Sequence, residues 1–117
     1  MRVVQNRAAA AILSFVVLLG GVSVFAQAQE VLTIDISIKN HRFQPAEIKA
    51  RADVPIRLQI KNLDATPAEF ESAALRVEKV IAGNSDGVIN LRSLKPGRYE
   101  FFDDFNKATA QGALIIQ

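Results

Sequence analysis

The chain has 117 residues, no cysteine and a formal net charge of +2 at pH 7. The missing cysteine excludes disulfides, a lipid-modified cysteine and every thiolate metal site. Only Arg2 and Arg7 precede residue 28 among the charged residues, so the remainder carries twelve basic and twelve acidic side chains and is formally neutral. This balance gives no reason to expect nucleic acid or an anionic membrane as a partner.

The N-terminal segment has the pattern of a secretory signal peptide. A basic start, MRVVQNR, precedes an apolar run of 18 residues without a charge, and Ala26 and Ala28 offer small residues where a signal peptidase cuts. We expect residues 1–28 to be the signal peptide and residues 29–117 to be one small domain, with no membrane insertion after cleavage. The alternative is an uncleaved anchor, for which the run is short, since a spanning helix needs about 20 residues.

Residues 29–117 read as short strands separated by turns. Residues 31–39, VLTIDISIK, and 54–62, VPIRLQIKN, alternate apolar and polar side chains, as half-buried strands do. Shorter strands are expected at 46–51, 68–72, 76–82, 88–94, 98–104 and 112–117, with turns at 40–45 and 62–67. This spacing predicts an all-β fold, an antiparallel Greek-key β-sandwich of seven or eight strands.

The segment LKPGRY places Leu94, Gly97 and Tyr99 just before a strand. It resembles the tyrosine corner of Greek-key sandwiches, in which the tyrosine hydroxyl bonds to nearby backbone. The alternative is an ordinary amphipathic tyrosine at the start of a strand.

Taken in order, the segments FQPAEIKARADVPIRLQIKN, EFES, EKVIAG, LKPGRYEFFDDF and GALIIQ resemble the cupredoxin-like domain of bacterial periplasmic proteins. The resemblance covers nearly all of residues 31–117. It is strongest to the group associated with high-affinity iron permeases, and to the cupredoxin module of ferrous-iron uptake systems. It implies a periplasmic location, a role in copper or iron handling and an inner-membrane iron permease or related metal transporter as partner.

A blue-copper centre is nevertheless excluded. The family pattern before the last strand is G-x-Y-x-F-x-C-x-x-H, and its front is present as Gly97, Tyr99 and Phe101. The four ligand positions hold residues that cannot replace the usual donors: Asp103 for cysteine, Asn106 and Ala68 for the histidines, and Ala110 near the axial methionine. Because type 1 copper needs a thiolate, no type 1 copper is expected.

The resemblance to the iron-uptake relatives implies a different, carboxylate-dominated metal site. They carry an E-x-E pair on the strand that corresponds to AEFES, and further ligands near the loop before the last strand. The candidate ligands here are Glu69, Glu71, Asp103 and Asp104, with His41 as a further candidate. Carboxylates suit iron and other hard cations, and imidazole helps copper(II), so an iron or copper ion is expected.

Strand alternation leaves open whether one site gathers all four carboxylates. With Phe70 in the core, Glu69 and Glu71 share the wet face; Asp104 is expected to accompany them, whereas Asp103 should point inward near the rim.

Each candidate also has a structural interpretation. Glu69 and Glu71 could be solvated edge residues, Asp103 and Asp104 could cap the loop, and His41 could be a surface turn residue. Glu78 and Lys79 are expected to form a surface charge pair.

Two functional hypotheses follow. The first is a non-enzymatic metal-handling module, and the second is a metal-free Greek-key domain that has lost its site and mediates protein contact. An enzyme is not expected, because the chain has no HExxH motif, no phosphate loop and only one histidine to share among catalytic roles.

Overall fold

The computed structural model describes residues 14–25 and 29–117. Residues 14–25 contain no helix or strand, and their side chains are exposed. None of the described helices is long and apolar enough to cross a membrane. The predicted cleavage point after Ala28 lies outside the described residues, so the signal peptide remains a prediction.

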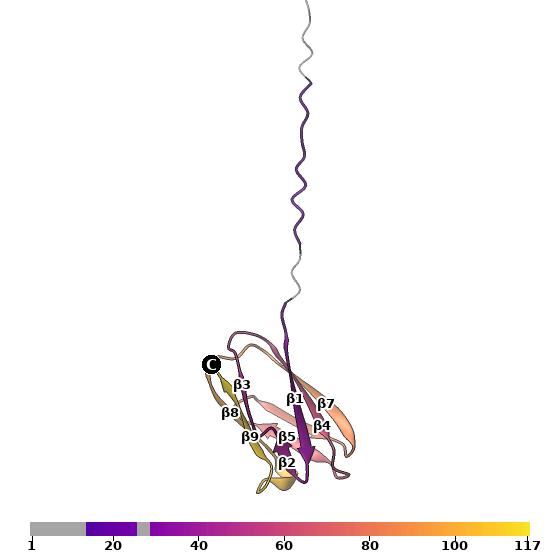
Figure 1. Cartoon of the computed structure of the whole chain (residues 1–117), viewed down its shortest axis with the longest axis vertical. Helices are drawn as coiled ribbons and strands as arrows, with labels where there is room; N and C mark the ends of the chain where they lie inside the picture. Colours follow the sequence, from indigo (N-terminus) through magenta and orange to yellow (C-terminus); the bar gives the residue numbers. More distant parts are fainter. Residues whose placement is uncertain (1–13, 26–28) are drawn as a thin grey trace, which may run out of the picture.

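Nine strands and one short 3₁₀ helix, η1, make up the domain (Figure 1). Their bounds are β1 Leu32–Lys39, β2 Arg42–Gln44, β3 Glu47–Ala50, β4 Ile56–Asn62, β5 Ala68–Ser72, β6 Val77–Ile81, β7 Ser85–Leu91, β8 Gly97–Asp103, η1 Asp104–Asn106 and β9 Gln111–Ile116. The all-β expectation is confirmed, but the described residues hold nine strands rather than seven or eight. The additional strand, β2, lies in the segment expected to be only a turn, because Asn40 and His41 adopt positive φ angles of 52° and 56° and close a hairpin.

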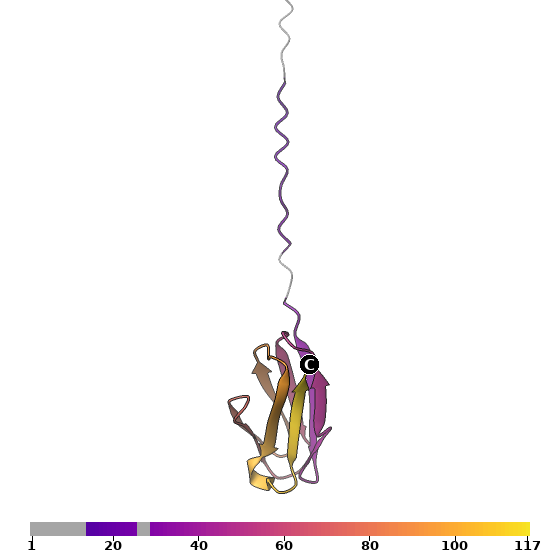
Figure 2. The ribbon, with the colours of Figure 1, turned by 90° about the vertical axis from the view of Figure 1, so that its left-hand side faces the viewer.

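The strands form two sheets, in the orders β2-β1-β4-β7 and β3-β9-β8-β5-β6. They face each other as the two layers seen edge-on in Figure 1 and turned in Figure 2. The sheets are mixed rather than purely antiparallel, because β1 runs parallel to β4 and β3 runs parallel to β9. The chain changes sheets between β2 and β3, at the cis peptide bond Gln44–Pro45.

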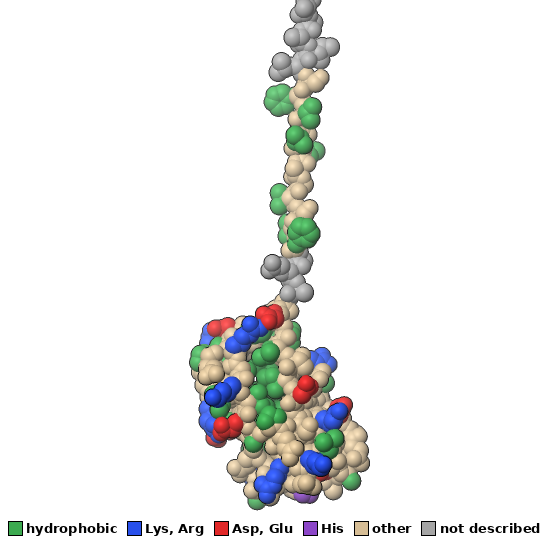
Figure 3. Space-filling view, viewed as in Figure 1, with side chains coloured by type: hydrophobic (Ala, Val, Ile, Leu, Met, Phe, Trp, Pro, Cys, Tyr) green, Lys and Arg blue, Asp and Glu red, His purple; other side chains and the backbone are tan. Residues whose placement is uncertain are grey.

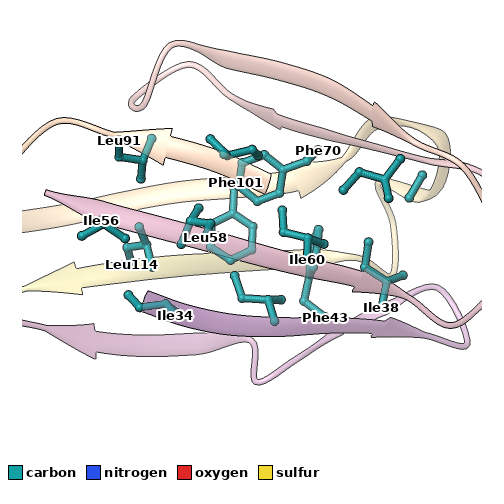
Figure 4. Packing of buried hydrophobic residues seen from close by; sticks show 14 of the residues in the cluster. Ile34, Ile38, Phe43, Ile56, Leu58, Ile60, Phe70, Leu91, Phe101 and Leu114 are labelled. Atoms are coloured by element: carbon teal, nitrogen blue, oxygen red, sulfur yellow. The ribbon is translucent and has the colours of Figure 1, made fainter. Parts of the chain in front are cut away.

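Alternating apolar side chains from both sheets fill the space between them (Figure 4). The buried apolar positions of β1 and β4 are Ile34, Ile36, Ile38, Ile56, Leu58 and Ile60. Opposite them, Phe101 packs at 4.9 Å from both Phe43 and Phe70, measured between ring centroids. These rings bury large apolar surfaces, and removing one of them is expected to cost about 3–5 kcal/mol of stability.

The tyrosine corner predicted from LKPGRY is confirmed. The Tyr99 hydroxyl donates a hydrogen bond to the backbone oxygen of Lys95 over 2.8 Å. This bond fixes the turn that leads into β8, the strand that carries the chain to Asp103 and Asp104.

One edge of the sandwich is only partly closed. Strand β2 pairs with β1 only from Ser37 to Lys39, so the first half of β1 has no neighbour on that side. Hydrophobic side chains form a stripe between β3 and β1 on this face (Figure 3). Leu32 of β1 and Ile48 of β3 are half-buried against the core.

Candidate metal centre

Three carboxylates meet on the outer face of the sheet that contains β5. Each of Glu69, Glu71 and Asp104 offers a carboxylate oxygen within 4.8 Å of the other two. We call these three residues the outer carboxylate cluster. Glu69 and Glu71 reach this face because Phe70 between them is fully buried, and neighbouring side chains of a strand point to opposite faces. Asp104 joins them as the first residue of η1, where β8 ends beside β5.

Glu78 on the edge strand β6 adds a fourth carboxylate beside the cluster. It lies directly opposite Glu71 in the β5–β6 ladder. Hydrogen bonding with the Glu78 side chain is the largest cause that raises the pKa of Glu69 above 4.5; partial burial and repulsion from Glu78, Asp104 and Glu71 raise it further.

Glu78 was not among the candidate ligands predicted from the sequence. The expected Glu78–Lys79 charge pair is wrong: no ion pair joins these two residues in the described part of the chain. Adjacent strand residues point to opposite faces, so the period-two pattern of β6 would have separated Glu78 from Lys79. Only the register with β5 could have identified Glu71 as its partner.

None of these four acidic side chains has a basic partner among the described residues. Five other acidic residues do form ion pairs: Glu30, Glu47, Asp53, Asp64 and Glu100. Negative charge is therefore concentrated at the outer carboxylate cluster without a direct ion pair, and a cation would reduce the repulsion there. The donors are all hard oxygens, which suit iron, manganese, calcium or copper(II) and do not suit copper(I). The exposed position of Asp104 leaves room for water as additional ligand.

Asp103 does not join the outer carboxylate cluster. Its side chain is fully buried and points inward, on the face that alternation predicts. One oxygen, Oδ1, accepts hydrogen bonds from the backbone N–H of Glu69 at 2.9 Å and of Phe105 at 3.0 Å. The other, Oδ2, accepts one from the Asn106 side chain at 3.1 Å. Both oxygens are thus engaged within the protein.

His41 lies in the β1–β2 hairpin, at the same end of the sandwich as η1 (Figure 1), but it is not part of the carboxylate group. Its backbone N–H donates to Asp64 Oδ2 at 2.9 Å, and its Nδ1 lies 3.7 Å from the same oxygen. The backbone N–H of Asn40 donates to Asp64 Oδ1. The pKa of Asp64 is lowered below 3.8, and the hydrogen bond from the backbone N–H of His41 is the largest cause. The hydrogen bond from Asn40 and the charges of His41 and Lys39 lower it further. The structure therefore separates His41 and Asp103 from the other three candidates.

Comparison with known proteins agrees with this architecture. Residues 9–116 match the family described as the cupredoxin-like domain. The chain belongs to the cupredoxin-like domain family. It is 43% identical over 86 residues, 74% of this chain and 69% of the other, to the uncharacterized protein RP394 of Rickettsia prowazekii, strain Madrid E.

Two solved structures illustrate the shared fold. The metal-binding domain of the Cu(I)-exporting P-type ATPase CopA of Streptococcus pneumoniae D39, solved with Cu(I), has a TM-score of 0.65 and 17% identity; the match covers 78% of this chain and 99% of that one. Auracyanin A, a blue copper protein of Chloroflexus aurantiacus, has a TM-score of 0.65 and 14% identity, covering 75% and 100% of the two chains. At these identities the likeness shows the fold alone.

Type 1 copper does not fit this cupredoxin-like domain. The four positions at which the resemblance places the copper ligands hold Asp103, Asn106, Ala68 and Ala110. None of them offers sulfur or imidazole, and the Asp103 carboxylate already accepts three hydrogen bonds. Within the described residues, no buried side-chain nitrogen or oxygen lacks a hydrogen-bond partner. The buried polar groups around Asp103 therefore have all their hydrogen-bond partners within the protein.

Proposed function

We propose that this protein is a periplasmic, non-enzymatic metal-handling module that binds iron or copper(II) through Glu69, Glu71 and Asp104. The observation that carries the proposal is the convergence of these three carboxylates within 4.8 Å, with no basic side chain paired to any of them in the described chain. Such a site selects hard cations, with water completing the coordination shell. The raised pKa of Glu69 supports the proposal, because its causes include, after hydrogen bonding with Glu78 and partial burial, the repulsion from Glu78, Asp104 and Glu71 that a cation would relieve.

The cellular role in this proposal is support of iron uptake, by delivering the ion to an inner-membrane iron permease or a related transporter. The sequence pattern of residues 1–28 supports export to the periplasm. Resemblance to the iron-permease-associated group supports iron, and the structural neighbours, whose descriptions name copper, support metal handling in general. A carboxylate site on the outer face of the sheet, with Asp104 exposed to solvent, is suited to reversible transfer of an ion rather than to its permanent storage.

Calorimetric titration of residues 29–117 with Fe²⁺, Fe³⁺ and Cu²⁺ tests the binding step. We expect heat and thermal stabilisation with at least one of these ions. The double variant Glu69→Gln/Glu71→Gln should abolish both and leave the fold intact by circular dichroism. The matched control is Asp35→Asn/Asp86→Asn, which removes the same charge from exposed positions of the other sheet and should bind as the parent does. No heat with any ion, or equal loss in the control, would end the metal-binding proposal.

A second function is favoured by the hydrogen-bonded interior around Asp103. Since that interior needs no ion, the chain could serve as a metal-free Greek-key domain that mediates protein contact. The same titration separates the two functions. A protein that binds none of the three ions, yet still captures a transporter in a pull-down that Glu69→Gln/Glu71→Gln does not weaken, would belong to the second class.

A further inference from the structure

Of the four positions at which the resemblance places copper ligands, Asp103, Asn106 and Ala110 are hydrogen-bonded to one another, and Ala68 adjoins a residue that is bonded to Asp103. The backbone N–H of Asp103 donates to the backbone oxygen of Ala110 at 3.0 Å, and that of Ala110 donates to Asn106 at 2.9 Å. Asn106 then donates through its side chain to Asp103 Oδ2. Ala68, the fourth position, is 2% exposed and directly precedes Glu69, whose N–H binds Asp103 Oδ1. The Asp103 carboxylate thus connects β8 to β5 and η1. The backbone N–H of the same residue binds the loop before β9.

Burying a carboxylate is costly unless hydrogen bonds compensate for the lost water. Here three donors surround a side chain with no exposed surface: two backbone N–H groups and one side-chain amide. Hydrogen bonds to a charged acceptor are stronger than neutral ones. The arrangement is therefore fully satisfied, and a metal ion placed there would have to displace these donors.

From these contacts we infer that the Asp103–Asn106 pair has taken over the structural place of the copper centre. It acts as a metal-independent tie that closes this end of the sandwich, and this interior position takes up no metal ion. The inference concerns the interior only and does not rest on ion binding by the outer carboxylate cluster. It also distinguishes Asp103 from Asp104: the adjacent carboxylates face opposite sides of β8 and have separate roles.

The test compares three variants in EDTA, so that its result is independent of metal binding. Asp103→Ala removes the two oxygens that accept all three hydrogen bonds, and we expect it to raise the unfolding equilibrium constant roughly hundredfold or more. Asp103→Asn keeps an acceptor oxygen and should cost clearly less, because Asn106 can turn its amide to restore the third bond. Asp104→Asn, the control with the same charge change one residue away, should alter the constant by about twofold at most.

Amide hydrogen exchange locates the effect. In Asp103→Ala the Glu69 and Phe105 N–H groups should exchange faster than in the parent. The exchange rates of the core amides of β4 should change only as much as the global free energy of unfolding changes. If Asp103→Ala does not fold, Asn106→Ala, which removes a single donor, replaces it and should speed exchange at the same two amides. Unchanged stability and unchanged amide exchange rates in these variants would contradict the proposal that the Asp103–Asn106 pair closes this end of the sandwich. So would a shift of the Asp103 carboxyl resonance when Cu(I) or Cu(II) is added to the Glu69→Gln/Glu71→Gln protein.

Discussion

Glu71 and Glu78 lie directly opposite each other in the β5–β6 ladder, and Glu69 and Asp104 stand on the same face. The Glu78 side chain raises the pKa of Glu69, first by hydrogen bonding and then by charge repulsion. Full ionisation of this face is therefore unfavourable. A cation or a proton can occupy the same position, so ion binding and pH are linked at this site.

The first prediction concerns the stability of the metal-free protein. Because the pKa of Glu69 is raised in the folded state, its stabilising contribution is complete below the ordinary value of 4.5 and is lost as pH rises through the folded pKa. At pH values above the folded-state pKa of Glu69, the parent should be less stable than Glu69→Gln, because the Gln side chain cannot ionise. Urea unfolding in EDTA from pH 4 to pH 7 measures this difference. Glu100→Gln, at an exposed carboxylate that pairs with Arg98, is the control and should not gain stability at neutral pH.

The second prediction concerns proton release on metal binding. Where Glu69 is protonated, an ion held by Glu69, Glu71 and Asp104 must displace that proton. Because the pKa of Glu69 is raised, proton release should be greatest near the raised pKa and small at higher pH. Calorimetry in two buffers of different ionisation enthalpy counts the protons. Glu78→Gln should reduce the release, because it removes the neighbour that contributes most to the raised pKa. An equal proton count at all pH values would place the ion away from Glu69.

The third prediction concerns the hairpin that carries His41. Asp64 accepts two backbone hydrogen bonds from residues with positive φ, and its pKa is lowered. A lowered pKa means that the stabilisation is present above the ordinary value of 3.8 and is lost as pH falls through the folded pKa. Asp64→Asn should therefore cost about 1 kcal/mol at neutral pH, and the difference from the parent should shrink in acid. Denaturant unfolding at pH 7 and at pH 3 checks both statements. A loss that persists undiminished at low pH would mean that packing of the side chain, and not its charge, holds the hairpin.

The fourth prediction concerns the tyrosine corner. Tyr99→Phe removes only the hydroxyl that binds the backbone oxygen of Lys95. We expect a loss of about 1 kcal/mol, typical of one hydrogen bond, without a change in metal binding, because the corner lies at the opposite end of β8 from Asp104. Denaturant unfolding and the calorimetric titration measure the two quantities. A parallel loss of metal affinity would show that the corner positions the whole of β8.

Local patterns predicted much of this molecule because side-chain direction in a strand depends on adjacent residues. Alternation around Phe70 placed Glu69 and Glu71 outside, and alternation along β8 separated Asp103 from Asp104. The parallel pairs β1–β4 and β3–β9 could not be read in the same way, because strand pairing depends on residues far apart in the sequence. Glu78 was missed for the same reason, since its place beside Glu71 follows from the register of β5 with β6. The role of Asp103 depends on the distant N–H of Glu69, 34 residues earlier in the chain.

The last prediction tests whether the residues around Asp103 keep the spatial arrangement of the lost copper ligands. The variant Ala68→His/Asp103→Cys/Asn106→His/Ala110→Met restores two imidazoles, a thiolate and a thioether, the donor set of blue-copper proteins. With Cu²⁺ it should gain an intense visible absorption band from the copper–thiolate bond. Without metal it should be less stable than the parent, because the three hydrogen bonds to Asp103 are gone. Asp103→Ser in the same background is the control and should remain colourless. A folded but colourless cysteine variant would mean that Asp103 and its neighbours no longer lie where a copper centre requires them, and that the hydrogen-bonded tie has reshaped this end of the fold.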